Sequence, residues 1–286
     1  LTLVLPYGIE NGDSLIKGDV DEKKQQPERI RFEYNTSFRF FGHTFDTVYV
    51  YRDDALVYLN EDCWTNNSYS MYHTRLEPRN GELFFTPYLA RMKRGRVFYR
   101  LIAQQQNDST SSLSKLTNEI RATSQTMAAT FCATHAFIIT WHQMVSRYLD
   151  DQSSHFCTFQ SVLVANQTIS FLLFNYDRLD FALADIESSS KKQFYAQVYV
   201  NAGDGKLFYS IDDSFSLKIN SSLLNNRKKI IFRVDDGISI QQHSTSMSSW
   251  LFISNSQLMN QLIMRVICPI LLIAFLIAVY VIRCSS

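Results

Sequence analysis

The chain has 286 residues, of which 46% are hydrophobic, 14% aromatic and 19% charged. This apolar content excludes an intrinsically disordered chain, and only 9 glycines and 5 prolines exclude a collagen-like one. A formal net charge of +1 excludes a generally polycationic protein. Because no nucleic-acid-binding motif is present either, nucleic acid is not an expected partner.

The N-terminal stretch is rich in turn-forming residues, and within it Gly12-Asp13-Ser14-Leu15 matches the block after which a family of serine esterases is named. Such an esterase needs a base to activate Ser14, supplied in that family by Asp-x-x-His near the C-terminus. The chain contains no Asp-x-x-His, since the nearest pair, Asp151 and His155, is one residue too far apart. We therefore predict a plain turn at Gly12 and no enzyme, with a hydrolase using Ser14 as an alternative.

Short aromatic or β-branched runs recur in the first half of the chain and predict a meander of strands. These runs are Ile30 to Tyr34, Phe38 to Phe41, Thr47 to Tyr51 and Leu56 to Leu59. One amphipathic helix is predicted from Leu113 to Met127, with Ser111 or Ser112 as its cap. Leu113, Leu116, Ile120 and Met127 share one face of it.

Strand patterns return after residue 136, and the chain shows no repeat of fixed period. The predicted strands are Phe137 to Trp141, Thr158 to Ala165, Ser170 to Tyr176, Phe194 to Val200, Leu207 to Ser210 and Ile230 to Val234. We therefore predict a mainly β fold, with sandwich-like antiparallel sheets and about one helix, plus a C-terminal transmembrane helix described below.

Five cations lie within ten residues, at Arg91, Lys93, Arg94, Arg96 and Arg100. Such a cluster attracts sulfated glycans or acidic matrix proteins, and its alternative interpretation is a solvated loop. His135 and His142 are separated by an odd number of residues, so a regular strand places them on opposite faces, where they cannot share a metal ion. No cofactor is predicted.

The cysteines do not form a dense disulfide framework. Cys63, Cys132 and Cys157 precede the hydrophobic C-terminus, whereas Cys268 and Cys284 lie in or just beyond it. Three cysteines allow one bridge, and the sequence does not decide which pair forms it. Cys132 with Cys157 is our candidate pair.

The seventeen residues from Val266 to Ile282 contain no charged side chain and lie between Arg265 and Arg283. As a helix they are roughly 26 Å long, a little short of a bilayer core, and snorkelling arginines close the gap. We predict a transmembrane helix here. The alternative is a lipid-anchor signal with small residues at 254–256, against which the polar C-terminal end argues.

Five Asn-x-Ser/Thr sequons, all before this segment, orient the chain with residues 1–265 outside the cytoplasm. Their asparagines are Asn35, Asn66, Asn107, Asn166 and Asn220. Since the sequence begins at Leu1 without a signal peptide, we expect one to have been either removed or left out of the sequence. The predicted organisation is an extracellular domain over 1–236, a Ser-rich juxtamembrane linker over 237–265, a span over 266–282 and a short cytoplasmic tail over 283–286.

Several blocks, taken in order, resemble the nidogen extracellular domain family. They are Leu5 to Asp13, Phe40-Phe41-Gly42 with Val48-Tyr49-Val50, Gly95 to Arg100, Thr140-Trp141, Thr158 to Val164, Phe174-Asn175-Tyr176, Asn201 to Gly205 and Phe232 to Asp235. The resemblance covers about residues 5 to 236. It departs from the family pattern at Arg91 and Lys93, where the family has two acidic residues.

The resemblance implies cell-matrix adhesion and extracellular assembly without catalysis. We therefore expect a single-pass plasma-membrane protein whose partners are extracellular matrix proteins or sulfated glycans, and whose charge at Arg91 to Arg100 is opposite to that of its relatives. A ligand-capturing receptor that acts through a partner remains an alternative, because almost nothing of the chain is expected inside the cell.

Overall fold

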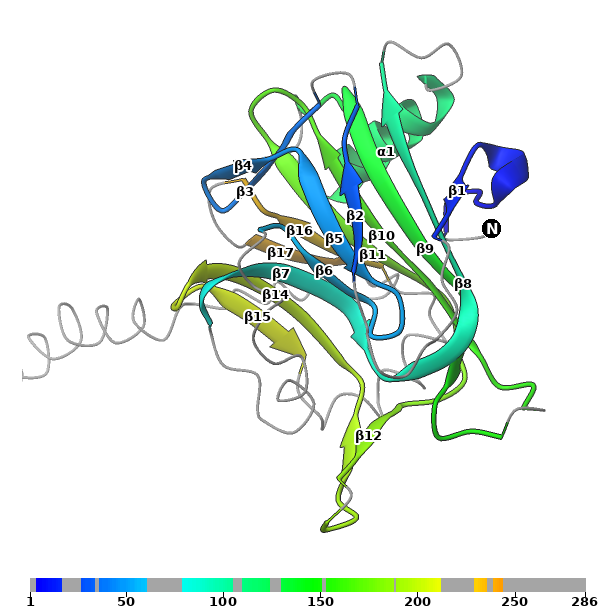
Figure 1. Cartoon of the computed structure of the whole chain (residues 1–286). Coiled ribbons are helices and arrows are strands. Elements are labelled where there is room, and N and C mark those ends of the chain that lie inside the picture. The colour runs from blue at the N-terminus through cyan, green and yellow to red at the C-terminus, as the bar shows by residue number, and fades with distance from the viewer. Residues whose placement is uncertain are drawn as a thin grey trace, which may run out of the picture. The chain divides into compact units, whose positions relative to one another are not determined.

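Two large antiparallel sheets dominate the computed structural model, which describes residues 4–16, 27–33, 36–60, 79–104, 110–123, 130–150, 153–187, 189–211, 229–235 and 239–243 (Figure 1). By contact density the chain divides into two units, 1–251 and 252–286, and every described residue belongs to the first. The larger sheet has the order β1 (Ser14–Leu15), β8 (Met92–Ala103), β9 (His135–Ser146), β10 (Cys157–Ala165), β11 (Ser170–Leu179), β16 (Lys229–Arg233) and β17 (Ser239–His243).

The second sheet has six strands in the order β15 (Phe208–Ile211), β14 (Gln197–Asp204), β7 (Asn80–Leu89), β6 (Leu56–Tyr58), β5 (Thr47–Tyr51) and β2 (Glu28–Arg31). Two small ribbons pair β3 (Phe38–Phe40) with β4 (His43–Phe45) and β12 (Leu183–Ile186) with β13 (Gln193–Tyr195). One helix, α1 (Thr110–Thr123), and a single 3-10 turn, η1 (Ile9–Asn11), complete the described elements.

The two large sheets face each other across an aromatic core. The ring of Phe85 on β7 lies 6.1 Å, centroid to centroid, from that of Phe174 on β11. Nearby, the buried Tyr176 hydroxyl donates a 2.8 Å hydrogen bond to the carbonyl of Pro87 and so ties the sheets together. Aromatic side chains bury large areas and prefer such offset contacts, which explains how this Phe- and Tyr-rich chain fills a sandwich core.

The outer face of the seven-stranded sheet is also covered. Leu113, Leu116 and Ile120 of α1 pack with Val162 of β10 and Leu173 of β11 in a second apolar cluster. Because β10 therefore has a cover on each side, all nine of its residues are buried. The predicted apolar helix face is confirmed at its three described positions.

The mainly β class with antiparallel sheets and one helix is confirmed among the described residues. Two long strands, β7 and β8, were not predicted: β7 is buried on both faces only from Leu83 onward, and β8 carries the charged cluster. The predicted helix cap is wrong, because α1 begins at Thr110 and places Ser111 and Ser112 inside its first turn.

The predicted membrane span and the linker before it lie outside the described residues, apart from 239–243, which form β17. Within the described part of the chain, no helix has the length and apolar character needed to cross a bilayer.

The candidate disulfide between Cys132 and Cys157 is not formed, because both thiols are free. Cys157 begins β10, whereas Cys132 lies beyond the other end of that strand, where the Thr134 amide donates to the Ala165 carbonyl over 2.9 Å. Eight residues of strand separate Cys157 from Ala165, roughly 26 Å, and a disulfide needs Cα atoms within about 7 Å. Burial raises the pKa of the Cys157 thiol to about 12. Cys63 lies outside the described residues.

A pH-dependent stability is expected from His135, the first residue of β9. Its Nε2 bonds the Ser37 carbonyl over 2.8 Å, and burial lowers its pKa, an effect that this carbonyl partly opposes. Between that lowered pKa and the ordinary value of about 6.5, the unfolded state binds more protons, so stability falls as pH drops. Thermal melts from pH 7.5 to 5.5 should show this loss, with a smaller slope in His135→Gln. Equal slopes in the two proteins would contradict the assignment.

Candidate functional site

Two neighbouring strands of the larger sheet bulge at the same place. The β8–β9 register shifts on both sides of Arg94, and the β9–β10 register shifts between Cys157 and Phe159. Gly95 has φ +136° and Gln143 has φ +51°, which are left-handed backbone conformations that side chains disfavour. A Cβ added at Gly95 would lie 2.9 Å from the Met144 Cα and 3.0 Å from the Gln143 carbonyl oxygen, so the close approach of the strands requires glycine.

A surface cavity of about 380 Å³ lies at these bulges. It is lined by Arg94, Gly95, Arg96, His142, Gln143, Val145, Ser153 and Phe156. Bulges re-aim side chains and interrupt strand pairing, and they recur beside functional sites. The cavity is therefore lined by polar and cationic side chains beside the bulges of β8 and β9.

Arg94 and Arg96 are the exposed members of the basic cluster. Arg94 donates a 3.1 Å hydrogen bond to the Ser153 carbonyl, and the Arg96 guanidinium carbon lies 5.5 Å from the centroid of the Phe98 ring. No carboxylate in the described part of the chain forms an ion pair with either arginine.

The other three cations of the cluster hold the fold together. Arg91 pairs with the buried carboxylate of Asp185 at 3.4 Å, and Lys93 donates to the Leu149 carbonyl. β8 is thus a strand and not a solvated loop, and Arg96 and Arg100 lie on the same face of it. Of the five predicted patch residues, only Arg94 and Arg96 are exposed.

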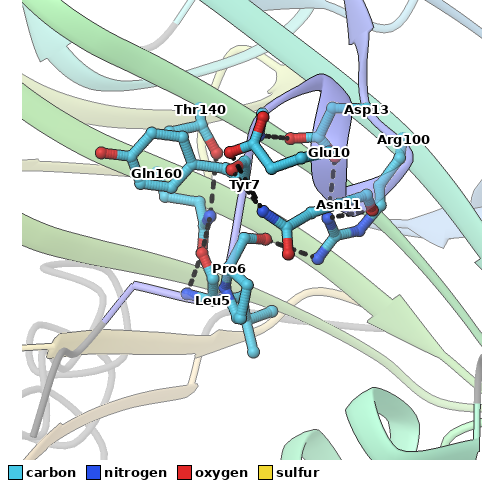
Figure 2. Close-up of polar contacts among 10 residues, drawn as sticks. Leu5, Pro6, Tyr7, Glu10, Asn11, Asp13, Arg100, Thr140 and Gln160 are labelled. Atoms are coloured by element: carbon cyan, nitrogen blue, oxygen red, sulfur yellow. Dashed lines mark hydrogen bonds and ion pairs between the residues drawn. The ribbon is translucent and has the colours of Figure 1, made fainter.

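Arg100 fixes the N-terminal segment to the edge of the larger sheet (Figure 2). Its guanidinium pairs with the Asp13 carboxylate at 2.8 Å and donates to the carbonyls of Pro6 at 2.7 Å and Asn11 at 3.1 Å. The second Asp13 oxygen accepts a 2.7 Å hydrogen bond from the Gly8 amide. Burial raises the pKa of Asp13, while the Gly8 amide and Arg100 act to lower it.

Asp13 and Ser14 belong to the block that resembles a serine esterase. Gly12 has φ +82° and ends the 3-10 turn, which confirms the predicted turn, and Ser14 pairs with Tyr99 as the start of the edge strand β1. The block is thus built into the docking of the N-terminal segment. Among the described residues, no group of three His, Cys, Asp or Glu side chains could hold a metal ion.

A buried polar network, which the sequence did not predict, holds the same segment further along (Figure 2). The Gln160 side chain accepts from the Leu5 amide at 3.0 Å and donates to the Leu5 carbonyl at 3.3 Å, as a strand partner would. It also donates to Thr140 Oγ1 at 2.8 Å and accepts from the Asn175 amide at 3.1 Å. Polar residues within the apolar runs of β10 and β11 are the signal that could have indicated it.

Tyr7 connects the N-terminal segment to the cavity. Its hydroxyl and His142 Nδ1 lie 2.9 Å apart, and the two ring centroids lie 5.1 Å apart. Burial lowers the pKa of His142, Arg96 lowers it further, and Asp177 opposes both. The ring is therefore mainly neutral at pH 7. As predicted, His135 and His142 lie on opposite faces of the sheet, since His142 faces Tyr7 outside and His135 packs on the core residue Phe38.

One of the five sequons lies within the described residues. Asn166 occupies the partly exposed turn between β10 and β11, and its side-chain oxygen accepts from the Thr168 amide at 2.9 Å, the Thr168 hydroxyl at 3.2 Å and the Ile169 amide at 2.8 Å. Asn35, Asn66, Asn107 and Asn220 lie outside the described residues.

Comparison with known proteins points to one family. The model of the nidogen-like domain matches residues 56–233. Human alpha-tectorin is 28% identical over 187 residues, which cover 61% of this chain and 8% of that protein, and the chicken protein is 26% identical over 185 residues, covering 62% and 8%. An uncharacterized protein of Caenorhabditis elegans is 29% identical over 122 residues, covering 38% and 8%. No solved structure gives a significant match.

The division of the basic cluster predicts unequal effects of neutralising its arginines. Arg100→Gln leaves the buried Asp13 carboxylate without its cation, so we expect a loss of about 2–4 kcal/mol in the free energy of unfolding and faster proteolysis of the N-terminal segment. Arg94→Gln, at an exposed position, should cost less than about 0.5 kcal/mol. Denaturant unfolding of both variants measures the difference. Similar losses would show that Arg100 does not hold the segment.

Proposed function

Because this chain belongs to the nidogen-like domain family, we propose that it is a non-catalytic extracellular protein that binds the extracellular matrix in cell-matrix adhesion. The residues matched by the family model, 56–233, include every strand of the two-sheet core from β6 to β16. The chain spans only 8% of the length of the curated relatives it matches. The partner of this chain therefore has to be inferred from its own surface.

The observation that supports this function is the pair of exposed arginines at the bulges. Arg94 and Arg96 lie on either side of Gly95, beside a cavity, and no described carboxylate pairs with them. Exposed cations on a rigid sheet attract anionic partners. Acidic matrix proteins and sulfated glycans both meet this requirement.

We further propose that the domain is held at the plasma membrane. The uncharged segment 266–282 would be the anchor, 237–265 the juxtamembrane linker and 283–286 the cytoplasmic tail, with 1–236 outside. The sequons, all of which precede this segment, support that orientation. A lipid anchor in place of the span would leave the domain on the same side of the membrane.

Matrix binding can be measured with the full chain, purified in detergent, on matrix laid down by cultured cells and freed of the cells. We expect saturable binding that falls at least about tenfold in Arg94→Glu/Arg96→Glu, because two attractive charges become repulsive. The control Arg31→Glu/Lys115→Glu makes the same change in net charge at exposed positions on β2 and α1 and should bind like the wild type. No saturable binding by the wild-type chain would overturn the proposed function.

Extracellular placement predicts an N-linked glycan at Asn166. In cells with a secretory pathway, Asn166→Gln and Thr168→Ala should each remove the same single glycan, because the first removes the acceptor and the second only the sequon. Mass spectrometry before and after peptide N-glycosidase treatment checks this, with Asn11→Gln as a control outside any sequon. An unmodified Asn166 in the wild-type chain recovered from the cell surface would contradict the prediction.

A further inference from the structure

We infer that the cavity at the β8–β9 bulges binds one sulfate group of a sulfated glycan, with Arg94 and Arg96 as its cationic contacts. The inference rests on the proposed function, from which it takes an extracellular partner. It goes further by assigning the ligand class and the residues that select it.

The two arginines favour an oxyanion with several oxygens. A guanidinium presents a planar set of N–H donors that matches oxyanions in a bidentate way, and such charge-assisted hydrogen bonds are the stronger kind. A carboxylate presents two coplanar oxygens, whereas a sulfate ester presents three terminal oxygens in a tetrahedral arrangement, which two guanidinium groups can approach from different directions. The Ser153 carbonyl accepts from Arg94, and the ring of Phe98 lies beneath Arg96, so both side chains are positioned in advance.

The cavity wall supplies further neutral donors. In the tautomer that accepts from the Tyr7 hydroxyl at Nδ1, His142 carries an N–H donor at Nε2, and the lining residue Gln143 has a side-chain amide. The Gln143 backbone is held in its left-handed conformation by an N–H that donates to Thr158 Oγ1 at 3.1 Å. Donors fixed in this way need little reorganisation when an anion binds.

The residues around the cavity favour a sulfated sugar over a free inorganic anion. Phe156 lines the cavity and presents an aromatic surface on which the apolar face of a sugar can pack, and the Arg178 guanidinium lies 4.0 Å from its ring centroid. Arg178 is itself paired with Asp180 at 2.6 Å. Asp177, whose charge acts on His142, places a carboxylate beside the cavity.

Asp177 limits the size of the anionic site. It repels negative charge on the β11 side, where Asp180 is neutralised by its ion pair with Arg178, while Arg94 and Arg96 attract an anion on the β8 side. The glycan is therefore recognised at one sulfate. The Asp177 carboxylate can accept hydrogen bonds from sugar hydroxyl groups next to that sulfate.

The test measures binding of the full chain, purified in detergent, to immobilised heparin, fully desulfated heparin and hyaluronan at an ionic strength of about 0.15 M. Heparin should bind, and the two unsulfated chains should bind at least about tenfold more weakly. Arg94→Gln/Arg96→Gln should lose at least about tenfold in heparin affinity, whereas the control Arg31→Gln/Lys115→Gln, with the same charge change, should lose less than about twofold.

A second variant separates a built site from simple charge attraction. Arg94→Lys/Arg96→Lys keeps both charges but removes the planar donors, so heparin affinity should still fall by about threefold or more. Melting temperatures equal to that of the wild type verify that the variants are folded. Full affinity in the lysine variant, equal binding of desulfated heparin, or an equal loss in the control would each overturn the inference.

The outcomes also separate this inference from the proposed function. If the chain binds cell-deposited matrix but heparin binding fails these tests, the sulfate site is overturned and the matrix-binding function stands. If heparin binding passes while matrix binding is absent, the site stands and the adhesive function is overturned.

Discussion

Both faces of β10, and of most of its neighbours β9 and β11, are removed from water, and this burial governs what surrounds these strands. The inner face packs on the aromatic side chains of the six-stranded sheet, as Phe85 does against Phe174. The outer face needs a second cover, which α1 provides over the apolar positions and the N-terminal segment over the polar ones. Burying a polar side chain in such a strand costs free energy unless it is hydrogen-bonded, and Gln160 is bonded through the backbone of Leu5.

The candidate site lies beside this outer cover. Tyr7 of the N-terminal segment contacts His142, and His142, Gly95 and Gln143 line the cavity at the bulges. Arg100 contributes by holding the segment, and Arg94 and Arg96 contribute by remaining uncovered. The arginines of this one strand therefore have two roles. Arg100 pairs with a carboxylate and stabilises the fold, whereas Arg94 and Arg96 have no carboxylate paired with them among the described residues and remain exposed.

The sequence predicts those features that depend on neighbouring residues better than those that depend on contacts between distant segments. The strands at 47–51 and 158–165 and the apolar face of α1 agree with the patterns that predicted them, because aromatic or β-branched runs and helical spacing are local signals. The strands β7 and β8 were missed because β7 begins with polar residues and contains Pro87, whereas β8 carries charges and bulges. The candidate pair Cys132 and Cys157 failed because opposite ends of β10 keep the two apart, and spacing along the chain carries no such information.

By itself, the sequence determined the mainly β class, the family resemblance that the comparison confirms and the presence of five cations between Arg91 and Arg100. Only the tertiary structure decided which of those cations are paired with carboxylates inside the fold. Arg91 and Arg100 meet buried carboxylates of Asp185 and Asp13, contributed by segments more than eighty residues away, as their positions in the chain show. Ion pairing acts over a few ångströms in space, so its effect on each arginine depends on the packing of distant segments and not on the neighbours along the chain.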